Sequence, residues 1–250
     1  MSTRRTQIDP EHLTALNTGR AEANNLAEAL AVDQAMLFDH VFPNASADVR
    51  AAVAAAQKHG ILKKMHQTGV ALNQHFDGTQ LAELTAHPSD TVRGWACFAR
   101  AATPGIEPAT LLQQLHPLAD DPHFAVREWA WLATRPVLVS DLTGSIQLLI
   151  PWTAHDSQYI RRFASEALRP RGVWSTHIAE LKTNPELGIP LLEPLRADPA
   201  RYVQDSVANW INDVARTKPD WVRKVCAEWL RDSPTAATQR IVKRAQRSLS

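Results

Sequence analysis

Two stretches in the second half of this 250-residue chain combine cations, carboxylates and aromatic residues at helical spacing. The first, IRRFASEALRPRGVW at 160–174, contains four arginines, one glutamate and one tryptophan. The second, YVQDSVANWINDVAR at 202–216, places Asn209 and Asp213 four residues apart, beside Trp210. Side chains four residues apart lie one above the other on a helix face. Such a face suits a partner that is both anionic and flat.

The charge of the chain is unevenly distributed, although the formal net charge is only +1. Residues 161–250 carry 16 Lys/Arg and 10 Asp/Glu, whereas the remainder carries 11 basic and 16 acidic residues. A basic half beside an acidic half indicates a surface for a polyanion. Charges that merely solvate helices explain the same counts, so composition alone leaves both interpretations open.

The elements that must position these residues form an internal repeat. Four segments, HPSDTVRGWA, DPHFAVREWA, HDSQYIRRFA and DPARYVQDSVA, each join a polar turn to an aliphatic anchor. The anchors are Val92, Val126, Ile160 and Val203, which are 34, 34 and 43 residues apart. This period and the helical spacing of apolar residues after each anchor predict helix pairs that resemble HEAT repeats. We therefore predict an all-α fold, an α-α superhelix of HEAT-like repeats with a concave surface.

The repeats are expected to form one domain over 1–250, a right-handed superhelix of about six helix pairs. Residues 1–75 would form an N-terminal cap, 76–216 the repeats and 217–250 further helices, because terminal units of a solenoid are usually atypical. The last helix carries Arg240, Lys243, Arg244 and Arg247 along one stripe. That stripe could contact phosphates or simply be a solvated outer face.

Several classes of function lack their sequence signals. The chain has no glycine-rich phosphate loop, no Gly-x-Ser-x-Gly elbow and no His-Glu-x-x-His helix. Cys97 and Cys226 lack metal spacing, and His87, His123 and His155 occupy repeat turns, where we expect polar structural roles. The start MSTRRTQIDPEH lacks an apolar run, and no stretch approaches the roughly 20 apolar residues of a membrane span. We expect a cytoplasmic monomer without a secretory signal, metal or cofactor.

The run RRFASEALRPRGVW, followed by IPLLEPLRADP and YVQDSVANWINDVARTKPDWV, resembles the bacterial DNA alkylation repair glycosylases of the AlkC/AlkD superfamily, on the AlkC side. The resemblance is specific over about 155–229 and weaker over 9–154. It implies excision of cationic alkylated purines, such as 3-methyladenine and 7-methylguanine, in base excision repair of duplex DNA. It also implies a cleft that holds the DNA backbone without turning the lesion into a pocket. Because the chain ends just past the helices, we expect none of the C-terminal β-domain that some relatives carry.

The chemistry of this reaction matches the residue types. An N-alkylated purine is already cationic, so it leaves readily, and the departing base leaves oxocarbenium character at C1′. A carboxylate near C1′ stabilises this charge and can orient or deprotonate water. Arginines bind the flanking phosphates, and tryptophans offer π faces to the sugar or the cationic base.

These roles are assigned to particular residues as expectations. Asp213 and Glu128 are the candidate catalytic carboxylates. The resemblance supports Asp213 better, because Glu128 lies seven residues before Arg135, whereas the family motif places its glutamate four before the arginine. Glu166 matches a Ser-Glu-x-x-Arg-Pro motif and is expected to position arginines. The expected DNA-binding residues are Arg161, Arg162, Arg169, Arg171, Trp131, Trp174, Asn209 and Trp210.

Two alternatives to a glycosylase remain open from the sequence. One is a catalytically silent relative that binds branched or distorted DNA through the same basic residues. The other is a HEAT-type scaffold for an acidic protein, which has less need of clustered arginine, tryptophan and carboxylate side chains.

Overall fold

The computed structural model describes residues 8–249, and every regular element in that range is a helix. Residues 1–7, on which part of the expectation about a secretory signal rested, lie outside the described range. Within the described residues no helix is both long enough and apolar enough to span a bilayer. The prediction of an all-α protein is confirmed.

The chain divides into two compact units, Met1–Ala133 and Thr134–Ser250. The boundary falls inside α9 (Phe124–Ser140), within the segment predicted to hold the repeats. The single domain over 1–250 and its right-handed twist stay predictions.

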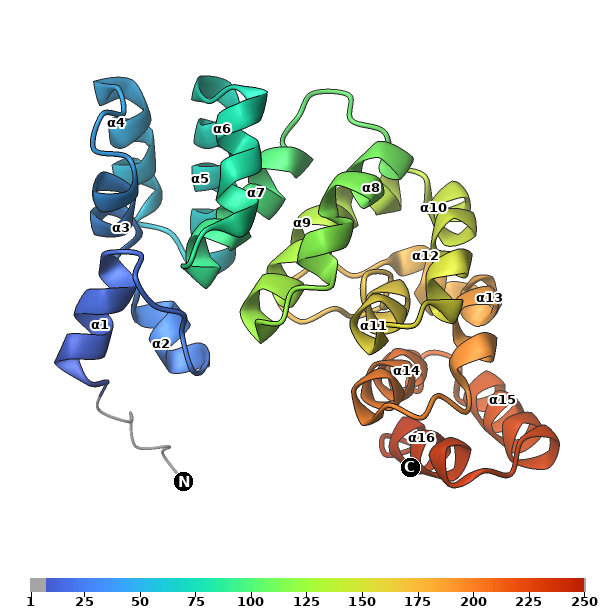
Figure 1. Cartoon of the computed structure of the whole chain (residues 1–250). Helices are drawn as coiled ribbons and strands as arrows, with labels where there is room; N and C mark the ends of the chain where they lie inside the picture. The colour runs from blue at the N-terminus through green and yellow to red at the C-terminus, as the bar shows by residue number, and fades with distance from the viewer. Residues whose placement is uncertain (1–7, 250) are drawn as a thin grey trace. The chain divides into compact units, whose positions relative to one another are not determined.

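The first unit consists of helices that pack on helices close to them in the chain. Within it α5 contacts both α4 and α7, and these helices run side by side in Figure 1. Its elements before α9 are α1 (Pro10–Asn17), α2 (Leu26–Ala31), α3 (Gln34–Val41), α4 (Ala47–Ala56), α5 (Ile61–His75), α6 (Gly78–Glu83), η1 (Leu84–Ala86), α7 (Asp90–Ala101) and α8 (Pro108–Ala119).

The second unit continues the pattern, with α14 packed against both α11 and α16 (Figure 1). Its elements after α9 are α10 (Leu142–Leu149), η2 (Ile150–Ala154), α11 (Gln158–Glu166), α12 (Ala179–Thr183), η3 (Pro185–Gly188), α13 (Ile189–Leu192), η4 (Glu193–Leu195), α14 (Arg201–Asp213), α15 (Pro219–Asp232) and α16 (Ala236–Ala245).

The four aliphatic anchors lie in the first turns of α7, α9, α11 and α14, and all four are fully buried. Each of these helices starts just after a polar turn, as the repeat pattern predicted. His87, His123 and His155 each accept a backbone N–H from two residues further along the chain, at 3.0, 3.3 and 3.0 Å to Nδ1. The expected structural role of these histidines is therefore confirmed.

A ladder of side chains links successive repeats. Arg93 donates to the His87 carbonyl in its own turn (2.7 Å) and to the Asp121 carboxylate of the next turn (Nε–Oδ2 2.8 Å). Arg161 repeats this arrangement with the His155 carbonyl (2.8 Å) and Asp198 (Nε–Oδ2 2.6 Å). The ladder satisfies the turn carbonyls and buried carboxylates at once.

This contact gives Arg161 a structural role, and its expected role as a clamp on a DNA phosphate stays a prediction. Its guanidinium is held by Asp198, whose side chain is buried, and by two carbonyls of its own turn. In the last repeat Gln204 takes the equivalent place and donates to the Asp198 carbonyl at 2.7 Å. The contact between Arg161 and Asp198 thus belongs to the ladder that links successive repeats.

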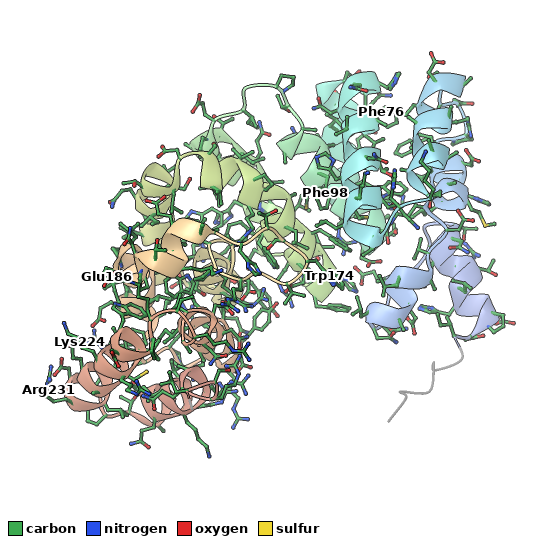
Figure 2. The ribbon with its side chains drawn as sticks, turned by 180° about the vertical axis from the view of Figure 1, so that it is seen from behind. Phe76, Phe98, Trp174, Glu186, Lys224 and Arg231 are labelled. Carbon is green, nitrogen blue, oxygen red and sulfur yellow. The ribbon has the colours of Figure 1, made fainter. Side chains whose placement is uncertain are left out.

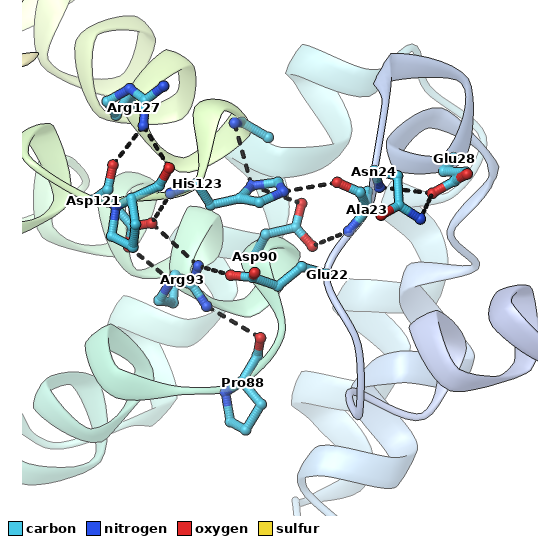
Figure 3. Close-up of polar contacts among 12 residues, drawn as sticks. Glu22, Ala23, Asn24, Glu28, Pro88, Asp90, Arg93, Asp121, His123 and Arg127 are labelled. Atoms are coloured by element: carbon cyan, nitrogen blue, oxygen red, sulfur yellow. Dashed lines mark hydrogen bonds and ion pairs between the residues drawn. The ribbon is translucent and has the colours of Figure 1, made fainter.

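The segment before α2 is tied to the repeats of the first unit by a polar cluster (Figure 3). The Ala23 N–H donates to Asp90 (3.2 Å to Oδ1), and His123 Nε2–H donates to the Ala23 carbonyl (2.7 Å). Arg93 also pairs with Glu22. These contacts hold the N-terminal helices, predicted as a cap, against the turns of the repeats.

We expect Arg161→Ala to lower the free energy of unfolding by about 3 kcal/mol, because it leaves the buried Asp198 carboxylate without its cation. Arg161→Gln should lose less, since glutamine can still donate to the turn carbonyls as Gln204 does. Urea denaturation measures both.

The matched control is Arg223→Ala, whose partner Asp220 is exposed, and it should change stability by less than about 1 kcal/mol. Equal losses at positions 161 and 223 would contradict the structural role of the ladder.

Candidate functional site

The candidate site lies in the second unit, where α11 and α14 meet the segment that follows α11. The two helices bury apolar residues toward each other, and polar contacts continue from this apolar face. Ser165 Oγ donates to Ser206 Oγ at 2.8 Å, and Ser206 Oγ donates to Glu166 Oε2 at 2.6 Å. Contacts between α11 and α14 therefore bring the two sequence stretches together.

An ion cluster of Glu166, Arg169 and Asp213 forms the centre of the site. Arg169 donates from NH1 to Glu166 Oε1 (2.8 Å), from Nε to Asp213 Oδ2 (3.0 Å) and from NH2 to Asp213 Oδ1 (3.2 Å). The two planar contacts to Asp213 are the bidentate geometry that arginine favours with carboxylates. Arg169 thus fixes the plane of the Asp213 carboxylate.

The two carboxylates of the cluster have opposite pKa shifts. Burial tends to raise the pKa of Glu166, but Arg162, Arg169 and the Ser206 hydroxyl together hold it below its usual value. For Asp213, burial outweighs Arg169 and the Arg171 N–H and raises its pKa. Glu166 is therefore a fixed anion, whereas Asp213 is the stronger base of the two.

A loop beside the cluster presents an aromatic side chain to solvent. The Arg171 N–H donates to Asp213 Oδ2 at 3.2 Å, which ties the start of the loop to the cluster. Trp174, labelled in Figure 2, is 48% exposed and has a φ of 61°, in the left-handed region that favours glycine. An exposed tryptophan in this backbone region is unusual for a residue with only a structural role.

The structure corrects the expectation for two other tryptophans. Trp131 and Trp210 are only 2% and 0% exposed, so neither presents a π face at the surface. Trp210 Nε1–H donates to the Leu168 carbonyl (3.0 Å), and Trp131 Nε1–H donates to Glu128 Oε2 (2.7 Å). Both rings belong to the core, where a large apolar ring with one satisfied donor is stable.

Three other residues predicted for the site, Glu128, Arg162 and Asn209, have contacts of different kinds. Glu128 lies in the first unit, apart in the chain from the cluster of the second. The Arg162 guanidinium stacks over the Tyr202 ring at 4.3 Å. Asn209 accepts from Arg247 NH2 at 2.8 Å, so it anchors the basic C-terminal helix end to α14.

Sequence reasoning missed two residues of the site. Ser206 reads as a neutral position on an apolar face, yet its hydroxyl bonds the Glu166 carboxylate. Arg135 was considered only for its spacing from Glu128, yet its guanidinium donates to the Arg169 carbonyl in the segment after α11. No local pattern signals either contact, because each partner lies 32 or more residues away.

No set of three His, Cys, Asp or Glu side chains that could hold a metal occurs within residues 8–249.

The fold and the site describe an all-α protein of HEAT-like helix pairs with a buried arginine–carboxylate cluster. No family model matches the chain. It is 41% identical over 117 residues to the uncharacterized protein YhaZ of Bacillus subtilis (strain 168). This match covers 47% of this chain and 32% of YhaZ. The chain thus spans about a third of the length of that relative.

Solved structures share the fold. The chain is similar to the Pseudomonas fluorescens alkylpurine DNA glycosylase AlkC bound to DNA containing an abasic site analog, with a TM-score of 0.70 and 24% identity over 100% of this chain and 65% of AlkC. It is also similar to AlkD2 from Streptococcus mutans, with a TM-score of 0.62 and 20% identity over 80% of this chain and 98% of AlkD2. The chain therefore shares the helical HEAT-like-repeat fold of the AlkC and AlkD2 structures. The resemblance predicted from the sequence is confirmed at the level of the fold, with the higher TM-score to AlkC.

The lowered pKa of Glu166 predicts how the cluster responds to acid. A carboxylate with a lowered folded-state pKa adds stability that is fully present above its unfolded-state pKa of about 4.5 and is lost as the pH falls through the folded-state value. The gap in melting temperature between the wild type and Glu166→Gln should thus be wide at pH 7 and narrow progressively below pH ~4.5.

Glu180→Gln is the control, because Glu180 is exposed and should leave the melting temperature nearly unchanged at every pH. A gap for Glu166→Gln that stays constant down to pH ~3 would contradict the ion cluster.

Proposed function

We propose that this chain is an alkylpurine DNA glycosylase that hydrolyses the N-glycosidic bond of cationic N-alkylated purines, such as 3-methyladenine and 7-methylguanine, in duplex DNA. The observation that carries the proposal is the Asp213 carboxylate, oriented by Arg169 and joined through the Arg171 N–H to a loop with an exposed tryptophan. The fold shared with AlkC, which is bound to DNA in its solved structure, supports it.

In this proposal Asp213 acts at C1′. As the cationic purine departs, positive charge grows on the sugar, and a fixed carboxylate stabilises it without having to reorient. Its raised pKa also makes Asp213 a better base for the attacking water than an ordinary aspartate. The side chain of Asp213 retains 11% exposure.

The other carboxylates fit different roles. Glu166 places its oxygens on Arg169 and Ser206, so it orients Arg169 and has little capacity left for the substrate. Glu128 accepts the Trp131 indole N–H, which commits one of its oxygens. We assign catalysis to Asp213 because it is joined to the Trp174 loop, and Glu166 is a positioning residue. Glu128, the other predicted catalytic carboxylate, stays a candidate in the first unit.

Arg171 is the proposed phosphate contact of this site. Its side chain is partly buried, and its Nε has no hydrogen-bond partner among the described residues. The rest of the side chain is partly exposed, so the guanidinium can bind a phosphate oxygen of DNA. The basic residues of α16 and beyond, Lys243, Arg244 and Arg247, lie on the helix that packs on α14 or just past its end and extend the cationic surface.

Stacking on Trp174 is the proposed contact with the lesion. An exposed indole offers its π face to a cationic base or to the sugar. The proposal also includes excision without base flipping by a single copy of the chain, followed by base excision repair.

A catalytically silent DNA-binding protein is the second candidate, and one observation favours it. Both oxygens of Asp213 already accept hydrogen bonds from Arg169, which reduces the negative charge available to C1′. The two candidates share the DNA contacts and differ in base release.

We expect Asp213→Asn to lower the single-turnover rate of 3-methyladenine or 7-methylguanine excision about a hundredfold, or by roughly 3 kcal/mol in activation free energy. Its affinity for the same DNA should change little, because the carboxylate acts mainly in the transition state. Excision rate, DNA affinity and melting temperature are measured on the same preparation.

Two further variants complete this experiment. Asp220→Asn changes an exposed aspartate of the same unit and should leave all three quantities unchanged. Arg171→Gln should weaken DNA binding and reduce its salt dependence by about one counterion. A stable, DNA-binding Asp213→Asn protein with an undiminished excision rate would remove Asp213 from the reaction.

A further inference from the structure

Arg135, near the end of α9 in the second unit, is a buried cation whose hydrogen bonds go to main-chain carbonyls. It is 3% exposed. NH1 donates to the Ala167 carbonyl at 2.8 Å, and NH2 donates to the Arg169 and Thr176 carbonyls at 2.6 and 3.0 Å. Ala167 and Arg169 precede the loop at 170–178 that carries Trp174, and Thr176 lies within that loop, after Trp174.

That loop is closed at its base and open at its tip. The Ile178 N–H donates to the Pro170 carbonyl at 3.0 Å, which joins the two ends, and the Arg171 N–H is tied to Asp213. Between these anchors Val173 and Trp174 are 59% and 48% exposed. A loop with fixed ends therefore holds two apolar side chains in solvent, and the backbone of Trp174 lies in the left-handed region of φ, which is unfavourable for a residue with a Cβ.

The guanidinium is suited to this position because it is a rigid, planar fork. Its two terminal nitrogens point in fixed directions, so one side chain can bridge acceptors on two chain segments. A lysine has a single ammonium and cannot span the same three carbonyls from one position. Burial and the nearby Arg169 lower the pKa of Arg135 to about 10, which still leaves it cationic at neutral pH.

We infer that Arg135 is a positioning residue that holds the 170–178 loop, so that Trp174 is presented beside the Arg169–Asp213 pair. It acts through the loop and does not itself contact DNA, because its guanidinium is enclosed by the carbonyls it binds. Its consequence for excision rests on the proposed glycosylase function, whereas its effect on Trp174 does not.

The test places a reporter on each of the eight tryptophans. Protein labelled with 5-fluorotryptophan gives one fluorine resonance per indole, and Trp174→Phe identifies the resonance of Trp174. We expect Arg135→Met and Arg135→Lys both to shift or broaden that resonance in DNA-free protein, while most of the other seven keep their positions. Excision should fall roughly tenfold to a hundredfold, with DNA affinity within about twofold, because small misplacements of a contact group act on the rate.

Arg127→Met is the matched control. Arg127 is a second buried arginine of α9, and it also donates to main-chain carbonyls, those of Asp121 (2.6 Å) and Pro122 (2.8 Å) in a repeat turn. Its loss should lower the melting temperature without moving the Trp174 resonance. The lysine variant keeps the charge at 135, so it separates the geometry of the fork from the charge, and it also serves if the methionine variant does not fold.

The outcomes separate the two proposals. An unchanged Trp174 resonance in the position 135 variants, or excision and affinity falling together by the same factor, would overturn the role of Arg135. A wild-type protein that releases no base would overturn the proposed function, while the fluorine spectra would still decide whether Arg135 holds Trp174.

Discussion

A carboxylate removed from water must find cations and donors within the protein, and Glu166 imposes this constraint on the second unit. Its side chain is almost fully buried between α11 and α14, and it is satisfied by Arg169 and Ser206. Arg169 then has a second edge to satisfy, which it does by binding both oxygens of Asp213. The orientation of the proposed catalytic carboxylate thus follows from the burial of a different one.

Arginine performs two distinct tasks in α11 and the segment that follows it. Arg161, at the start of α11, joins a repeat turn to Asp198 of the next repeat, so it belongs to the ladder that spaces the helix pairs. Arg169, eight residues later, lies beyond the end of α11 and binds the carboxylates of Glu166 and Asp213. Position within the repeat therefore decides whether an arginine supports the fold or the site.

Periodicity made much of this architecture predictable. The spacing of Val92, Val126, Ile160 and Val203 predicted four helices with buried first turns, and the polar turns before them predicted their starts. The proximity of the two charged stretches followed from the same repeat. These features depend on contacts between neighbours in sequence or between adjacent repeats, which a regular pattern records.

The remaining features depend on partners that no local pattern identifies. Arg161 resembled a phosphate clamp because its partner Asp198 lies 37 residues away. Trp210 resembled a surface aromatic because it adjoins Asn209, yet its ring is buried and its N–H reaches the Leu168 carbonyl 42 residues away. Arg135 escaped notice because carbonyl acceptors leave no trace in the sequence.

The central claim, that this fold and cluster serve base excision, is tested most directly by the unmodified protein. Duplex DNA treated with a methylating agent is incubated with an excess of protein, and the free bases are separated and quantified by mass. The account predicts time-dependent release of 3-methyladenine or 7-methylguanine well above the spontaneous rate, with unmodified purines retained. Protein that binds this DNA but releases no more base than the buffer alone would contradict it and would identify a silent DNA-binding protein instead.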